Sequence, residues 1–530
     1  MKKAQIKEYI EKNSTYLGIE LGSTRIKAVL IAPNHETIAS SDYSWENVYE
    51  NGYWTYHMED VWTGLQTAFA DLCKNVKNEY GVTLKSVASI GFSAMMHGYI
   101  PLNKDGQLLA PFRTWRNTTT SESASKLTKL FNFNIPLRWS IAHLYQAMLN
   151  GEEHVKDIDY ITTLSGYIHY CLTGEKVLGI GDASGMFPID SDKCDYNSKM
   201  LAEFDNISGD MPWKIKDILP KVLCAGENAG FLTEKGAKLL DPTGNLQAGI
   251  PFAAPEGDAG TGMVATNAVA VKTGNVSAGT SIFAMIVLEH ELSKVYEEID
   301  MVTTPTGKPV AMVHCNNCTN EINAWANVFK EFLVSIGQNP DMNQIFTSMF
   351  TESLNADTDA GGLLLYNYLS GEPITNLTDG RPLLVRKPES KLNFANFMKS
   401  QLYSALATLK LGMDILTNEN VTIEKLLGHG GYFKTPVVGQ KLMAAATNTP
   451  VSVMESASEG GPWGMALLSA YLVQKSQGQS LEDYLNNSVF ADKPVTTIEP
   501  DENDISGFEE FMKNYVAGLE IEKTAVNYLK

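Results

Sequence analysis

The sequence predicts an α/β protein with two domains built on one plan, and three observations support this prediction. First, 530 residues are too many for one hydrophobic core, because single cores stop growing at about 250–300 residues. Second, apolar strand-like runs alternate with amphipathic helix-like stretches, which is typical of α/β folds. Third, the pattern of residues 16–32 recurs at residues 268–288, which indicates duplication of one architecture.

The opening of the chain predicts a meander of three strands. Residues 16–21 and 26–32 are apolar and β-branched, and the Gly-Ser-Thr-Arg break between them predicts a tight turn between antiparallel strands. The third strand is expected at residues 37–45. From Glu59 onward, apolar residues at helical spacing predict an amphipathic helix that ends before Gly81. Residues 87–92 then predict a buried strand.

The second half repeats this opening. Residues 268–272 and 282–288 predict two strands around small-residue turns, and long helices are expected near residues 320–336, 395–417 and 433–447. Two such domains facing each other would leave a cleft, which is a preferred place for ligands. The expected organisation is an N-terminal extension (1–15), a first domain (16–263), a second domain (264–476) and a tail packed on the second domain (477–530).

Charge and cysteine content restrict the classes of partner. The chain has 42 basic and 61 acidic residues, so it repels phosphate backbones, and we expect no nucleic-acid or membrane partner. A small anionic ligand is still compatible, because backbone amides and a divalent cation can outweigh the global charge at one site. Six scattered cysteines and an N-terminus without an apolar segment predict a cytoplasmic protein without a signal peptide.

The first candidate motif runs from Gly18 to Lys27. A turn of small residues between strands leaves backbone N–H groups free to bind phosphate oxygens. The side chains that could assist are Glu20 as a ligand of hydrated Mg²⁺, the hydroxyls of Ser23 and Thr24 after Gly22, and the charge of Lys27. Taken alone, an ordinary hairpin without a ligand explains this turn better, because hairpin turns are commonplace.

The second motif surrounds Asp258, which lies among small residues at an expected strand-to-helix junction. A carboxylate at such a place can accept the proton of a hydroxyl that attacks phosphorus. Asp is also favoured as a helix N-cap. Taken alone, the two interpretations are evenly balanced.

Further glycine-rich turns occur in the second half, at Gly279-Thr280-Ser281 and around Gly430 and Gly431. Glycine permits close approach of the backbone to a flat ligand or a phosphate, although a flexible loop has the same composition. A separate segment, 314–318 (HCNNC), contains one CxxC pair. One pair without a second makes a poor zinc site, so buried or loop thiols are expected there.

The order and spacing of these motifs over residues 16–475 resemble the FGGY carbohydrate kinases, in the superfamily of actin, hexokinase and the Hsp70 ATPase domain. Within that family the sequence is most similar to xylulokinases. The similar segments are 91–98 (GFSAMMHG), 112–117 (FRTWRN), 165–174 (SGYIHYCLTG), 182–185 (DASG), 362–372 (GLLLYNYLSGE), 428–431 (GHGG) and 460–468 (GGPWGMALL).

The resemblance implies two actin/hexokinase-like (RNase H-like) domains with an active-site cleft between them, the first binding sugar and the second ATP. It implies Asp258 as general base and Glu20 as a ligand of Mg²⁺ through water. The implied ATP and phosphate ligands are Gly22, Ser23, Thr24, Lys27, Gly279, Thr280, Gly430 and Gly431. The implied sugar ligands are Met96, His97, Trp115 and Asn117. Taken alone, His97 and Trp115 would more often be core residues.

The implied activity is ATP-dependent phosphorylation of a hydroxyl of a small, xylulose-like ketose. Two alternatives stay open: a kinase of another ketopentose or polyol such as ribulose, and a nucleotide-binding regulatory ATPase without sugar kinase activity. Three departures from the family pattern bear on this choice: Glu20 replaces an Asp, Ala259 replaces a polar residue, and Arg116-Asn117 replaces Asn-Asp. Base rates for such enzymes favour a homodimer, although no residue marks an interface.

Overall fold

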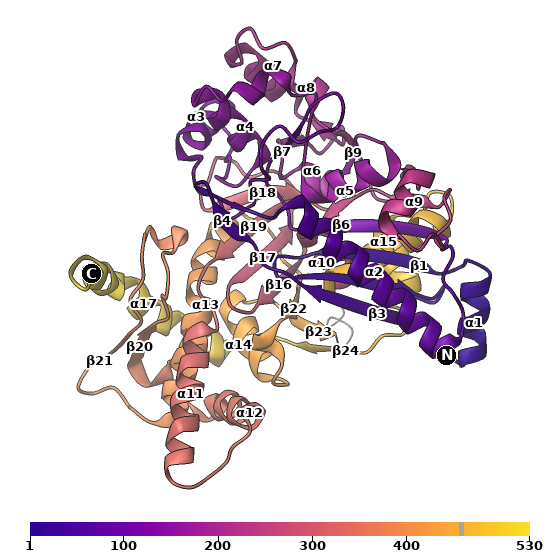
Figure 1. The fold of residues 1–530 in the computed structure, drawn as a ribbon. Helices are drawn as coiled ribbons and strands as arrows, with labels where there is room; N and C mark the ends of the chain where they lie inside the picture. Colours follow the sequence, from indigo (N-terminus) through magenta and orange to yellow (C-terminus); the bar gives the residue numbers. More distant parts are fainter. Residues whose placement is uncertain (455–459) are drawn as a thin grey trace. The chain divides into compact units, whose positions relative to one another are not determined.

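The computed structural model describes residues 1–454 and 460–530 (Figure 1). The chain forms two compact units, and both are discontinuous in sequence. The first unit consists of Met1–Val269, Asp300–Val310 and Glu459–Asp492, and the second consists of Ala270–Ile299, Ala311–Ser458 and Lys493–Lys530. The domains expected from the sequence, residues 16–263 and 264–476, are continuous stretches and stay a prediction.

The first unit is built on a mixed sheet. Its strands lie in the order β13 (Asn228–Phe231), β14 (Pro251–Ala253), β6 (Ser89–Ala94), β1 (Tyr16–Leu21), β2 (Arg25–Ile31) and β3 (Thr37–Ser44), and β15 (Glu256–Gly257) also pairs with β6. Strand β1 is antiparallel to β2 and parallel to β6, and β15 is parallel to β6. The carboxyl ends of β1, β6 and β15 therefore meet at one edge of the sheet.

Helices cover both faces of β1. Its apolar side chains that alternate with Gly18 and Glu20 join the core beneath α2 (Met58–Tyr80). The face that carries Gly18 and Glu20 packs against α15 (Gly460–Gln474). The approach is so close that a Cβ on Gly18 would overlap the carbonyl of Pro462. Glycine at position 18 is therefore required by packing.

The remaining elements of the first unit extend this sheet and its cover. The helices are α1 (Lys3–Glu11), α3 (Ser121–Phe131), α4 (Ser140–Leu149), α5 (Leu164–Thr173), α6 (Ile180–Ala183), α7 (Ser198–Ile207), α8 (Ile215–Ile218), α9 (Glu234–Leu240), α10 (Asp258–Ala265) and α16 (Leu481–Tyr484). The short strands are β4 (Val48–Glu50), β5 (Tyr53–Thr55), β7 (Ile100–Leu102), β8 (Tyr160–Thr162), β9 (Val177–Gly179), β10 (Ile189–Asp190), β11 (Asp195–Tyr196) and β12 (Lys221–Leu223).

The second sheet repeats the central pairing of the first. Its strands lie in the order β18 (Ile299–Thr303), β19 (Pro309–Cys315), β17 (Ile282–Val287), β16 (Thr273–Ala278), β22 (Lys425–His429), β23 (Val451–Met454) and β24 (Val495–Ile498). Strand β16 is antiparallel to β17 and parallel to β22, as β1 is to β2 and β6. This repetition confirms the predicted duplication.

Long helices and one small hairpin complete the second unit. They are α11 (Asn320–Ser335), α12 (Met342–Glu352), α13 (Phe394–Asn418), α14 (Val438–Thr447), α17 (Glu502–Tyr528), and the strands β20 (Leu363–Tyr366) and β21 (Leu383–Arg386). In α13 most side chains are buried, consistent with a helix in the centre of this unit. Among the described residues, no helix has both the length and the apolar character needed to cross a membrane.

Most of the predicted elements are confirmed, and one strand was wrong. The meander of residues 16–45, the helix after Glu59, the strand near residue 90 and the helices near 320–336 and 395–417 are all present. The strand expected at residues 268–272 is a turn, and the strand lies instead at Thr273–Ala278. That strand reads TGNVSA, with turn-forming Gly and Asn, and pairing with β17 and β22 on either side overrides this local preference.

Candidate functional site

The ends of three parallel strands assemble the first part of the candidate site. In the sheet of the first unit, Ser93 of β6 lies in register with Glu20 of β1 on one side and Glu256 of β15 on the other. Beyond this level the chain leaves the sheet at Gly22, Met95 and Asp258. Segments far apart in the sequence therefore bring their functional side chains to the same edge.

Asp258 is the first residue of α10, and Gly257 is the N-cap. The alternative interpretation, in which Asp258 is the N-cap of the helix, is therefore wrong, because the N-cap is the residue before it. The Met96 amide donates a hydrogen bond to Oδ1 of Asp258 at 3.3 Å. Burial raises the pKa of Asp258 to about 6, and the Met96 amide acts in the opposite direction. The carboxyl is half-buried, so a small molecule can still reach it.

Glu20 lies beside Asp258 and is also half-buried. The hydroxyls of Ser93 and Thr261 each approach its Oε2 at 3.4 Å. Burial, followed by the negative charge of Asp258, raises the pKa of Glu20 to about 8. A Cβ on Gly461, in the first turn of α15, would overlap this carboxylate, so the longer Glu side chain depends on glycine there.

The first hairpin turn presents free backbone donors. Its carbonyls are occupied: the Trp45 indole donates to Gly22 at 2.8 Å, the Tyr56 hydroxyl donates to Ser23 at 2.6 Å, and the Trp45 amide donates to Thr24. Among the described residues, none accepts a hydrogen bond from the amides of Ser23 or Thr24. Carbonyls held inward and amides left outward are the polarity that binds an anion.

Lys27 lies opposite Glu20 in the register of β1 and β2. Its positive charge lowers the pKa of Glu20, although burial outweighs this effect. Lys27 thus acts electrostatically on the candidate metal ligand, next to the turn that holds Ser23 and Thr24.

Met96 and His97 form the turn that follows β6, and both side chains are buried. The Nδ1 atom of His97 lies 3.2 Å from the Gly185 carbonyl, which can only accept, so Nδ1 carries the proton and Nε2 is an acceptor. Burial, with the nearby Arg138 charge, holds the pKa of His97 well below its usual range. A neutral imidazole with a free acceptor is suited to a hydroxyl donor.

Trp115 and Asn117 lie on one loop but have different surroundings. The Trp115 side chain is 38% exposed and is therefore available to a ligand. The amide of Asn117 is committed to backbone groups: its Oδ1 accepts from the Trp54 amide at 2.8 Å, and its Nδ2 donates to the carbonyls of Trp54 and Thr114. In this structure the hydrogen bonds of Asn117 hold the loop that carries Trp115 in place.

Two buried carboxyls beneath Asp258 were missed from the sequence. Glu256 accepts hydrogen bonds from the amides of Gly181 and Asp182 at 3.3 and 3.0 Å. Asp182 accepts from the hydroxyls of Thr163 and Ser165, while its Oδ1 has no partner among the described residues. Burial raises the pKa of Asp182 to about 7 and that of Glu256 to about 8. An acid inside the small-residue run before Asp258 was the available signal.

The second unit contains a turn equivalent to the first hairpin. Residues Gly279-Thr280-Ser281 join β16 to β17. The carbonyl of Thr280 accepts from the Cys318 amide at 3.0 Å, and that of Gly279 accepts from the amide and hydroxyl of Thr319. Within the described part of the chain, the amides of Thr280 and Ser281 have no acceptor. Both hairpins thus expose donors and hold their carbonyls inward.

Gly430 and Gly431 follow β22, next to the start of that second turn. Gly430 has φ +99°, and a Cβ there would overlap the carbonyl of Ala278, the residue before Gly279. Gly431 is exposed, and a Cβ on it would meet open space. The glycine loop and the second hairpin turn are therefore neighbours within one unit.

Helix α15 contains one of the segments that carry the resemblance, residues 460–468. Residues 460–468 form the start of α15, which packs on β1, β6 and α10 of the first unit. Gly464 makes room for the carbonyl of Thr261 on α10. The helix thus packs against the elements that carry Glu20 and Asp258.

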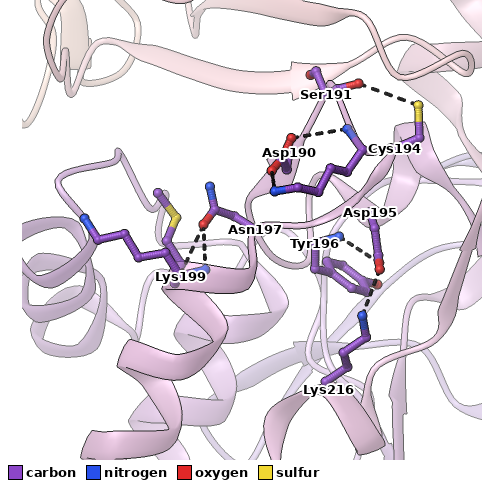
Figure 2. A network of polar contacts seen from close by, with 10 residues as sticks. Asp190, Ser191, Cys194, Asp195, Tyr196, Asn197, Lys199 and Lys216 are labelled. Carbon is purple, nitrogen blue, oxygen red and sulfur yellow. Dashed lines mark hydrogen bonds and ion pairs between the residues drawn. The ribbon is translucent and has the colours of Figure 1, made fainter.

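Another polar cluster surrounds the β10–β11 hairpin (Figure 2). Asp190 pairs with the neighbouring Lys193, and Asp195 with Lys216 at 2.8 Å. Asn197 caps α7 by accepting from the amide of Lys199. These contacts pair the charged side chains with one another and stabilise the turn. Among the residues drawn in Figure 2, they leave no group of unpaired side chains that could form a binding site.

Comparison with known proteins identifies the fold family. The FGGY family of carbohydrate kinases matches residues 15–265 with its N-terminal domain and residues 274–473 with its C-terminal domain. A xylulose kinase of Haemophilus influenzae is 21% identical over 468 residues, covering 84% of this chain and 89% of that protein. Among solved structures, a xylulose kinase of Lactobacillus acidophilus has a TM-score of 0.78 at 16% identity, covering 97% of this chain and 99% of that one.

A gluconate kinase of Lactobacillus acidophilus is similar to the same degree, with a TM-score of 0.77 at 17% identity and coverage of 97% and 98%. At such identities the solved structures establish the fold, while the two domain matches together span most of the sequence. The chain is a member of the FGGY family of carbohydrate kinases, phosphotransferases that act on an alcohol group.

Proposed function

We propose that this protein transfers the γ-phosphate of ATP to a hydroxyl of a small ketose, most similar to xylulose, with Asp258 as the general base. The observation that carries the proposal is the position of Asp258, half-buried at the sheet edge and next to Met96 and His97. Residues 16–263 would supply the sugar site and residues 264–476 the ATP site.

The proton step follows from the geometry around Asp258. The Met96 amide occupies one oxygen, Oδ1, and fixes the carboxyl at the start of α10. The other oxygen is left to accept the proton of the sugar hydroxyl as that hydroxyl attacks phosphorus. In phosphoryl transfer most of the catalysis is positioning and charge stabilisation, so a fixed carboxylate is sufficient.

In each unit, the outward amides of the hairpin turn would bind phosphate oxygens, with the hydroxyls of Ser23 and Thr24 in the first turn and of Thr280 in the second adding donors. Gly430 and Gly431 would receive the adenosine. In the described residues no group of three or more His, Cys, Asp or Glu could hold a metal. A single carboxylate, Glu20, fits Mg²⁺, which is usually held by one or two carboxylates, phosphates and water. Bound Mg²⁺ would neutralise phosphate charge.

The sugar would bind against Met96, His97 and Trp115, with Asn117 holding the Trp115 loop in place. The xylulose kinase relatives support a ketopentose, while the similar fold of a gluconate kinase keeps other acceptors open. Ala259, in the first turn of α10, has no polar group for a sugar hydroxyl. Specificity would therefore depend on the remaining polar groups of the pocket.

A coupled assay of ADP release tests this proposal. Purified protein with Mg·ATP is given xylulose, ribulose, a series of pentitols, glycerol or gluconate in turn, and a sample without any acceptor is the control. We expect one acceptor, a xylulose-like ketose, to stimulate ADP release at least tenfold, with the phosphorylated sugar detected by mass spectrometry.

The other outcomes discriminate between the alternatives. Stimulation by ribulose or a polyol alone would retain the kinase and change its substrate. ADP release that no acceptor stimulates would contradict the kinase and favour the regulatory ATPase, for which Glu20 and Ala259 are the relevant departures.

A further inference from the structure

Two motifs of the second unit lie outside the proposed chemistry. One is the Ser-Gly-Glu sequence at residues 370–372, after β20, and the other is the Asn-Asn pair at residues 316–317, inside the CxxC segment after β19. Both thiols of that segment are buried. The polar residues between them are joined to Ser-Gly-Glu by a set of hydrogen bonds.

Glu372 is the centre of this set and is fully buried. Its Oε2 accepts three hydrogen bonds: from the amide of Asn316 at 3.0 Å, and from the amide and the Nδ2 of Asn317 at 3.3 and 3.1 Å. A buried carboxyl is costly unless it is paired in this way. The arrangement therefore fixes the backbone of residues 316–317 strongly.

The same loop is also held from the opposite direction. Oδ1 of Asn317 accepts from the amides of Leu369 and Ser370 at 3.0 and 3.1 Å. Nδ2 of Asn316 donates to the Gly371 carbonyl at 2.8 Å, and a Cβ on Gly371 would overlap Thr378. Each residue of the Ser-Gly-Glu motif thus helps to hold the Asn-Asn pair in place.

Residues 316–319 are hydrogen-bonded to the second hairpin turn. Cys318 donates its amide to the Thr280 carbonyl, and Thr319 donates its amide and hydroxyl to the Gly279 carbonyl at 3.1 and 2.7 Å. These bonds hold the hairpin carbonyls inward, which leaves the amides of Thr280 and Ser281 outward. Displacing residues 316–319 would release the carbonyls and weaken an anion site at this turn.

We propose that Glu372 and Asn317 are positioning residues for nucleotide phosphates, acting through Cys318 and Thr319 on the second hairpin turn. This inference rests on the proposed function, because it takes that turn as a phosphate site. It assigns a function to the Ser-Gly-Glu motif: the motif orients the donors of the Gly279–Ser281 turn.

The test compares Glu372→Gln with a matched control, Glu522→Gln. Glu522 is also a fully buried carboxyl of the second unit; it accepts from the Arg381 amide and has one oxygen without a partner in the described residues, as Glu372 has. ADP affinity is measured by calorimetry, and KM is measured separately for ATP and for sugar.

We expect Glu372→Gln to weaken ADP binding and raise the KM for ATP about tenfold, because a charge-assisted acceptor is lost. Glu522→Gln should leave both within twofold, and the KM for sugar should not change in either variant. Equal ADP affinity in wild type and Glu372→Gln, or an equal loss in both variants, would overturn the proposal.

A second variant covers the case in which Glu372→Gln does not fold. Thr319→Val is nearly isosteric and removes only the 2.7 Å bond to Gly279. It should weaken ADP binding about threefold or more at unchanged KM for sugar. Wild-type ADP affinity in Thr319→Val would contradict the link between loop and hairpin.

A double-mutant cycle tests whether Glu372 and Asn317 act as a unit. Asn317→Asp places a second carboxyl against Glu372, so it should weaken ADP binding. Adding Glu372→Gln then restores an amide–carboxylate contact and should improve ADP binding over Asn317→Asp alone. If Glu372→Gln weakens ADP binding equally in the wild type and in Asn317→Asp, the two side chains act independently. That result would refute their joint positioning role.

These readouts separate this inference from the proposed function. Suppose that the wild-type protein binds ADP, that Glu372→Gln binds it more weakly, and that no sugar stimulates ADP release. This result would support the positioning role of Glu372 and would refute the sugar kinase.

Discussion

The choice of general base depends on which carboxyl is ionised near neutral pH. Four acids with raised pKa values lie near one edge of the first sheet: about 6 for Asp258, 7 for Asp182, and 8 for Glu20 and Glu256. A base must be deprotonated before it can accept a proton. Asp258 has the lowest of these values and is half-buried, whereas Asp182 and Glu256 are fully buried. It is therefore the best suited of the four.

The pKa of Asp258 predicts the acid limb of the pH–rate profile. Because its pKa is raised to about 6, the carboxylate form is lost as pH falls through 6, and kcat/KM for sugar should fall about tenfold per pH unit below that value. Above pH 7 this group should cause no further change. The measurement is kcat/KM at saturating Mg·ATP between pH 5 and 9, and a profile that stays flat down to pH 5 would exclude Asp258 as the titrating base.

For individual residues, the sequence predicted Asp258, Met96 and His97 as neighbours only because its motifs resemble those of a known family. The hydrogen bond from Met96 to Asp258 joins residues 162 positions apart, and nothing local in the chain encodes it. Asp182 could not be assigned, because an isolated acid in a sequence does not reveal that it will be buried. For Glu256, the only signal was its place in the small-residue run before Asp258.

Among the secondary-structure elements, the first hairpin was predictable, the second was predictable only in its turn residues and its second strand, and the supports of both turns were not predictable. The strands β1 and β2 have clear β-branched patterns, and the turn between them is marked by small residues. The groups that hold its carbonyls come from distant segments, Trp45 and Tyr56. The polarity of each turn, which decides whether it binds an anion, is therefore a tertiary property.

The glycine loop after β22 gives a prediction that separates folding from binding. Gly430→Ala puts a Cβ against Ala278 at φ +99° and should destabilise the protein by about 1–3 kcal/mol. Gly431→Ala meets open space in the free protein, so its stability should stay within about 0.5 kcal/mol of wild type. Both variants should weaken ADP binding if the proposed adenosine site is correct, because each adds a methyl group to that site.

Thermal unfolding and ADP calorimetry on the two variants check this pair of expectations. If Gly431→Ala binds ADP as tightly as the wild type, the glycine loop is not part of a nucleotide site. A loss of stability in Gly431→Ala would contradict the open space around Gly431.

At the scale of the whole molecule, duplication was predictable and the packing of α15 on the first unit was not. The repeated pattern of strands at residues 16–32 and 273–287 is present in both sheets. The helix α15 lies in sequence between β23 and β24 of the second sheet, yet it packs on the first unit. Gly18 permits its close approach to β1, and Gly464 permits its close approach to α10. Such a return of the chain depends on the fit of distant surfaces, which apolar periodicity does not report.

The most direct test of the account is the turnover of Asp258→Asn, measured with the sugar that stimulates ADP release and paired with ADP calorimetry. Asparagine retains the shape and the acceptor for the Met96 amide but cannot take the proton. We predict a fall in kcat of about 100-fold or more, with ADP affinity within twofold of wild type. Near-normal turnover in Asp258→Asn would contradict the assignment of the base.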